Sequence, residues 1–162
     1  MFINGSNLDM NNNKRLIMSI WDPIDKARKS HKELFARIMN DESSLYKYIA
    51  VVAEGILYKY LQDKNCSKQT AASLSSVDSF HKRSMSIIII RAIQNLRNGN
   101  LPSNVEVFSR DLVDMDLFAV SSYLDGIITF DKLTIETFDV FRRYYLHHFR
   151  RPLSSKVISS CV

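Results

Sequence analysis

Three short apolar segments alternate along this chain with longer segments whose apolar residues recur at helical spacing. The short segments are residues 2–4, 105–108 and 126–130, and the last, GIITF, runs directly into Asp131. The helical pattern is clearest over residues 45–62, 80–96, 111–124 and 134–149. Short apolar strands separated by helices are typical of a parallel sheet with helices on its faces. The sequence therefore predicts an α/β fold with a small parallel sheet.

The same segments allow a second interpretation, an all-helical bundle. In that fold VEVF (residues 105–108) and IITF (residues 127–130) are apolar positions on helices. Asp41 fits a helix cap in either fold, because its carboxylate can accept a hydrogen bond from the first turn. Residues 65–79 are small and polar, and predict a loop or a weak helix start.

Length and composition indicate one domain over residues 1–162. No apolar run approaches the roughly 18 to 20 residues that a membrane span needs. The N-terminus lacks the basic and apolar regions of a secretory signal, and the two cysteines have no metal-binding spacing. These observations predict an intracellular, cytoplasmic protein without a membrane span.

The basic residues are concentrated near the C-terminus. The net charge is +5, the pI is near 9.2, and no acidic side chain follows Asp139. The candidate nucleic-acid-binding residues are Arg142, Arg143, His147, Arg150 and Arg151, interleaved with Tyr144, Tyr145 and Phe149. Cations and aromatic rings together predict phosphate contacts and base stacking, with RNA as the partner. Alternatively, the cations stabilise the C-terminal end of a helix whose tyrosines pack inward.

Carboxylates and one amide lie where the predicted strands and helices meet. Asn4 ends the first apolar segment and Asp131 follows the last, while Asp114 and Asp116 open the helix between. Glu54 lies on a helix in mid-chain. Because the carboxyl ends of parallel strands share one edge of a sheet, we expect these side chains to meet there. Their oxygen atoms suit Mg²⁺ or Mn²⁺, which can activate water against a phosphodiester.

These motifs resemble those of PIN-like and NYN-like nucleases, in the same order and over nearly the whole chain. FINGSN (residues 2–7) is similar to the first motif of that family, and IITFD (residues 127–131) to the last. The resemblance implies a PIN-like, Mg- or Mn-dependent endoribonuclease. The implied catalytic residues are Glu54, Asp114 and Asp131, and the implied metal ligands are Asn4, Asp114, Asp116 and Asp131. Thr129 and Asn7 would orient the carboxylates.

One position departs from the family. Asn4 stands where the family carries an aspartate, and an amide oxygen supplies no charge to hold a cation. The resemblance therefore also allows a catalytically impaired, RNA-binding relative of the nucleases.

Two further functions fit an all-helical fold. Arg142 and His147 resemble the Arg-x4-His motif of HEPN-type ribonucleases, in which His performs acid–base chemistry and Arg stabilises phosphate charge. The other is a protein-interaction module of viral or mobile-element type, which the Ile, Lys, Asn and Ser bias favours. Its expected partner is another protein or a second copy of the chain.

Overall fold

The fold was analysed in a computed structural model of the whole chain. The structure describes residues 24, 26, 28–97, 114–124, 126–129, 131–153 and 156–158. The helices are α2 (Lys32–Asn40), α3 (Glu42–Asp63), α4 (Lys68–Ser76), α5 (Phe80–Arg97) and α7 (Lys132–Phe149), and residues 114–121 are also helical. Two three-residue strands, β1 (Gly126–Ile128) and β2 (Lys156–Ile158), pair in parallel with Gly126 opposite Lys156.

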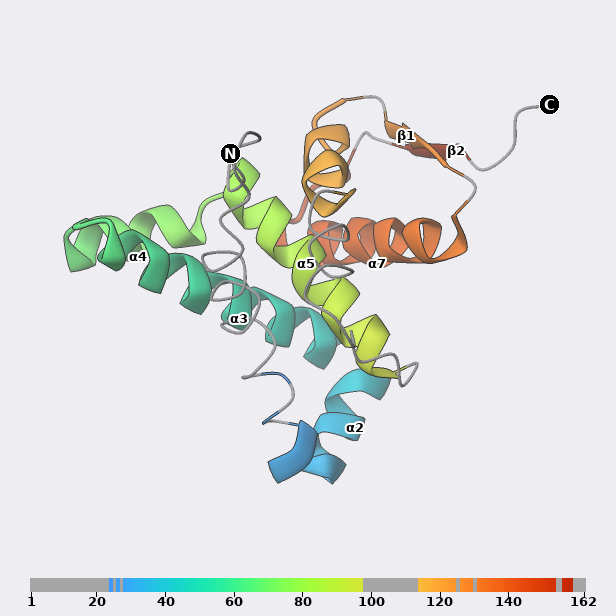
Figure 1. Cartoon of the computed structure of the whole chain (residues 1–162), viewed down its shortest axis with the longest axis horizontal. Helices are drawn as coiled ribbons and strands as arrows, with labels where there is room; N and C mark the ends of the chain where they lie inside the picture. The colour runs from blue at the N-terminus through green and yellow to red at the C-terminus, as the bar shows by residue number, and fades with distance from the viewer. Residues whose placement is uncertain are drawn as a thin grey trace, which may run out of the picture.

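The predicted α/β fold is wrong, because the described residues form an all-helical body. β1 and β2 pair only with each other, and they lie to one side of the helices rather than between them (Figure 1). GII at 126–128 is extended, as predicted for GIITF. The other two predicted strands, residues 2–4 and 105–108, lie outside the described residues. Helices, and not a sheet, therefore carry the apolar surface that forms the core.

Helix α5 lies at the centre of the body. Every residue from Lys82 to Ile93 is buried, including the four isoleucines at 87–90. Helices α3 and α7 both pack on α5, and α4 packs along α3 (Figure 1). A helix that is surrounded by other helices buries its whole circumference, so it does not show the one-sided pattern of a surface helix. The core cluster extends from Ile24 to Leu153.

Side-chain caps fix the starts of α3 and α4. Asp41 accepts a hydrogen bond from the Ser44 backbone N–H at 2.8 Å, which confirms the predicted cap of α3. Ser67 accepts one from the Thr70 N–H at 3.1 Å and starts α4. Of the two alternatives predicted for residues 65–79, a loop or a weak helix start, the helix is the one that forms, over Lys68–Ser76, since a serine cap compensates for the small, polar composition.

None of the helices among the described residues is long and apolar enough to cross a bilayer.

The surroundings of Gly55 allow a test of α3. A Cβ atom added to this exposed glycine would meet no other atom within 4 Å. Gly55→Ala should therefore raise the free energy of unfolding by about 0.5–1 kcal/mol, because alanine loses less conformational freedom in a helix. Urea denaturation measures the change. Ala53→Gly, at a buried position two residues away, should lower the same quantity by ~1 kcal/mol or more. Destabilisation by Gly55→Ala would contradict an exposed helical glycine.

Candidate interaction site

The acidic residues expected to share a metal ion lie on α3, on the 114–121 helix and at the start of α7, and three of them accept a hydrogen bond from another residue. Glu54 on α3 accepts a hydrogen bond from Lys82 Nζ at 2.6 Å. Asp116 accepts one from Ser84 Oγ at 2.6 Å, and Asp114 is exposed at the start of the 114–121 helix. Asp131 caps α7 through the Thr134 N–H at 2.7 Å, and these bonds to Thr134 lower the pKa of its carboxyl.

The other predicted site residues are one metal ligand, Asn4, and the two residues expected to orient the carboxylates, Asn7 and Thr129. Thr129 Oγ1 accepts a hydrogen bond from the Asp131 backbone N–H at 3.2 Å. Asn4 and Asn7 lie outside the described residues. Among the residues that are described, no three His, Cys, Asp or Glu side chains gather in a group that could hold a metal. The Mg or Mn requirement stays a prediction.

A buried ion pair connects the end of α7 to α3 and α5. Lys82 is fully buried, and its Nζ donates to Glu54 Oε1 and, at 3.3 Å, to the Ser75 carbonyl. His148 Nε2 lies 3.7 Å from the same Glu54 oxygen, and the His148 ring stacks on Tyr144. Burial lowers the pKa of Lys82 and of His148, and the Lys82 charge lowers that of His148 further. Burial also raises the pKa of Tyr144 to about 12.

A second polar cluster is centred on Arg83. Its guanidinium forms two hydrogen bonds of 2.8 Å to Asp78 and also donates to the Ser122 carbonyl and the Tyr145 hydroxyl, each at 2.8 Å. The Tyr145 hydroxyl in turn donates to Asp78 at 2.6 Å, and Arg151 also pairs with Asp78. The rings of Tyr123 and Tyr145 lie 3.7 and 4.7 Å from the Arg83 Cζ atom. Burial raises the pKa of the Asp78 carboxyl, but hydrogen bonds from Arg83 and Tyr145 outweigh this effect and lower the pKa to about 2.

The basic residues of α7 and the following turn face different surroundings. Arg142, Arg143 and Arg150 are exposed, whereas Arg151 is held by Asp78 and His147 packs against the ring of Tyr46. Tyr144 and Tyr145 are buried, so they cannot stack on bases, as the inward-packed alternative expected. Arg142 and His147 are five residues apart, and this spacing turns them about 140° from one another around a helix.

Two features of the surface could contact another molecule. The first, here called the apolar row, consists of Leu117, Val120 and Leu124, which are 59%, 45% and 60% exposed. The opposite side of the same helix places Met115, Phe118 and Ala119 in the core. This segment is therefore apolar both toward the core and toward solvent.

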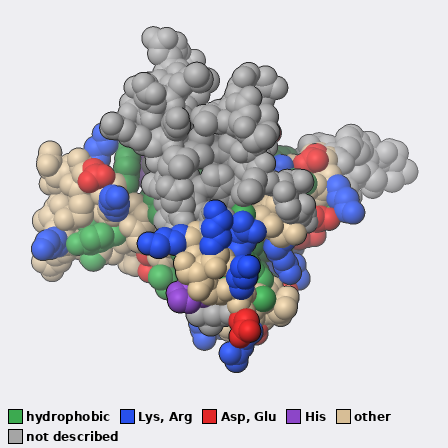
Figure 2. All heavy atoms as spheres, turned by 60° about the horizontal axis from the view of Figure 1, so that its bottom comes forward, with side chains coloured by type: hydrophobic (Ala, Val, Ile, Leu, Met, Phe, Trp, Pro, Cys, Tyr) green, Lys and Arg blue, Asp and Glu red, His purple; other side chains and the backbone are tan. Residues whose placement is uncertain are grey.

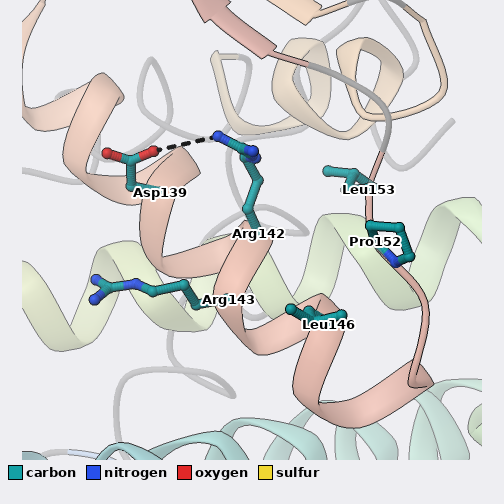
Figure 3. A pocket seen from close by; sticks show the side chains of 6 residues that line it. All are labelled: Asp139, Arg142, Arg143, Leu146, Pro152 and Leu153. Atoms are coloured by element: carbon teal, nitrogen blue, oxygen red, sulfur yellow. Dashed lines mark ion pairs between the residues drawn. The ribbon is translucent and has the colours of Figure 1, made fainter.

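The second feature is a hollow on the outer face of α7, with a volume of about 430 Å³. Figure 3 shows its lining: Asp139, Arg142, Arg143, Leu146, Pro152 and Leu153. Basic side chains also gather near the middle of the face in Figure 2, where acidic side chains are fewer. The surface of the molecule thus offers both an apolar area and positively charged areas to a partner.

The chain matches no known protein family, no curated protein and no solved structure. Sequence reasoning did not identify Lys82, Arg83 or Asp78, because a polar stretch at the start of a helix is usually exposed. The sequence signal was the run of four isoleucines at residues 87–90, because such a run indicates a helix that is buried on all sides rather than on one face.

Removal of the Asp78 charge should be costly. Asp78→Asn leaves the buried guanidinium of Arg83 without its carboxylate, so the free energy of unfolding should fall by about 3 kcal/mol or more. Urea denaturation at neutral pH measures the loss. Arg151→Gln is the matched control, because it removes an exposed cation from the same carboxylate and should cost much less. Equal losses in the two variants would contradict a central role for the Asp78–Arg83 pair.

His148 should make stability depend on pH. Burial holds the pKa of His148 in the folded protein below the usual histidine value of about 6.5, so the unfolded chain takes up the proton more readily. The free energy of unfolding should therefore decrease as the pH falls below about 6.5. His148→Gln should make the decrease between pH 7 and pH 5 shallower in urea denaturation. Parallel curves for the two proteins would show that Glu54 offsets the effects of burial and Lys82.

Proposed function

We propose that this chain is a helical protein-interaction module whose apolar row packs against the apolar face of a partner helix. The observation that supports the proposal is the row itself, because Leu117 and Val120 are exposed on a helix whose other side is already in the core, and Leu124 is exposed in the turn that follows this helix. Adjacent exposed apolar side chains on a folded domain commonly mark a surface that another molecule covers.

The spacing of the row suits a helical partner. Leu117 and Val120 lie three residues apart on the 114–121 helix and therefore share one side of it, and Leu124 follows in the turn after the helix. A second helix can place its own ridge of apolar side chains against such a row. Full burial of a leucine contributes roughly 1.5–3 kcal/mol, so three partly exposed side chains offer enough for a weak or moderate contact.

The end of the row is held in a fixed position. Tyr123, next to Leu124, stacks on the guanidinium of Arg83, and Ser122 accepts two hydrogen bonds from the same group. These contacts tie the segment that carries the row to α5. A surface that is already ordered loses less conformational entropy when a partner binds.

An RNA-binding function has less support from the described residues. The arginines expected to contact phosphate are partly exposed, but the two tyrosines expected to stack on bases are in the core. A phosphate contact without stacking would give sequence-independent binding that weakens steeply with salt. The helical body also replaces the sheet on which the PIN-like site would depend.

The row can be tested by Leu117→Gln with Leu124→Gln. Because both side chains are exposed, the free energy of unfolding should change by no more than about 0.5 kcal/mol. A photoreactive side chain at position 120 should give discrete cross-linked adducts in cells that express the chain, and the double variant should lose them. The matched control is Leu74→Gln with Val77→Gln, which removes similarly exposed apolar groups near α4 and should keep the adducts.

Two outcomes would contradict the proposal. A loss of ~2 kcal/mol or more in the row variant would show that the chain itself covers these leucines. Adducts that persist unchanged in the row variant would show that the partner binds elsewhere.

A further inference from the structure

The hollow on α7 is built from a helix face and a returning segment of chain. Arg142, Arg143 and Leu146 come from α7, and Pro152 and Leu153 come from the residues that follow it (Figure 3). Arg150 has φ 56°, ψ 25°, in the left-handed region, and this residue ends the helix. The chain can then turn so that Pro152 and Leu153 form the second wall.

The second wall is fixed by contacts on both sides of the turn. Arg151 pairs with Asp78, which lies between α4 and α5. Leu153 is buried in the core cluster. An anchored residue thus lies on either side of Pro152, and the hollow does not depend on an unattached segment.

The guanidinium groups at the hollow can pair with a carboxylate of a ligand. Arg142 lies 3.9 Å from Asp139, and Arg143 lies 2.7 Å from Glu42, but the side chains in both pairs are 43–61% exposed. Exposed pairs of this kind contribute only about 0–1 kcal/mol each. A carboxylate from another molecule can therefore compete for either guanidinium at little cost to the fold.

The apolar part of the lining decides between classes of ligand. Leu146 is 52% exposed beside the two arginines, and Leu153 and Pro152 lie across from it. A polynucleotide would gain most from exposed aromatic rings, but Tyr144 and Tyr145 of the same helix are buried. An acidic peptide matches both parts, since carboxylates pair with guanidinium groups in a two-point geometry and an apolar side chain covers the leucine.

We propose that this hollow binds an acidic segment of a partner protein, with an apolar side chain against Leu146 and carboxylates on Arg142 and Arg143. The site is separate from the apolar row, so it extends the proposed function to a second contact of different chemistry. Arg151 is a positioning residue here, because it holds the wall of the hollow and its guanidinium is engaged by Asp78.

The test uses the full chain and a fluorescein-labelled peptide in which one leucine lies between two Glu-Glu pairs. Fluorescence polarisation should detect binding at moderate salt. Arg142→Gln with Arg143→Gln should weaken it by about tenfold or more, and Leu146→Ser should weaken it several-fold. Lys59→Gln with Lys68→Gln removes two exposed cations on other helices, and this charge-matched control should bind like the unaltered chain.

Four results would overturn the proposal. The first is no peptide binding up to about 1 mM, and the second is equal weakening by the lysine control. The third is unchanged affinity for a peptide with serine in place of the leucine. The fourth is displacement of the peptide by a lower concentration of oligouridine RNA, when binding of this RNA also requires Arg142 and Arg143. Leu117→Gln with Leu124→Gln should leave peptide binding intact. Loss of peptide binding therefore does not bear on the apolar row, and loss of the row's adducts does not bear on the hollow.

Discussion

One buried guanidinium, that of Arg83, joins α5 to the described segments 114–124 and 131–153. Arg83 uses all five of its N–H groups, on Asp78, on the carbonyl and hydroxyl of Ser122, and on Tyr145. Burial of a charge is costly unless it is paired and every donor is satisfied, and this arrangement meets both conditions. The same group therefore fixes the linker before α5, the end of the 114–121 helix and the last turns of α7 with respect to one another.

Both surface features are consequences of that arrangement. Tyr123 covers one side of the Arg83 guanidinium and so orders the end of the apolar row. Asp78, the carboxylate that Arg83 needs, also holds Arg151 and with it the turn that forms one wall of the hollow. Lys82, next to Arg83 on α5, pairs with Glu54 of α3, and His148 of α7 lies against the same Glu54 carboxylate. Buried polar contacts thus position exposed side chains that themselves contribute little to the stability of the fold.

The sequence predicted individual helices far better than it predicted the fold. The limits of α3, α5 and α7 lie within three residues of those expected, since long periodic segments and an aspartate cap are strong local signals. The fold class was wrong because the first three residues of GIITF do form a strand, but three extended residues cannot show how many neighbours they have. The order of Glu54, Asp114 and Asp131 suggested a shared site. In the structure, Glu54 neutralises Lys82 and Asp131 caps a helix, and both are contacts that sequence spacing does not reveal.

The contacts of Arg83 also have a consequence for synthesis on the ribosome. Ser122 and Tyr145 follow Arg83 by 39 and 62 residues, and Arg151 follows Asp78 by 73. At about 5–20 residues per second, translation of the 62-residue interval takes on the order of 3–12 s. For the first 39 residues of that interval the nascent chain lacks Ser122, and it lacks Tyr145 until the end of the interval. The isoleucine face of α5 that α7 covers also remains without its neighbour, so this interval is when the chain most needs protection from aggregation.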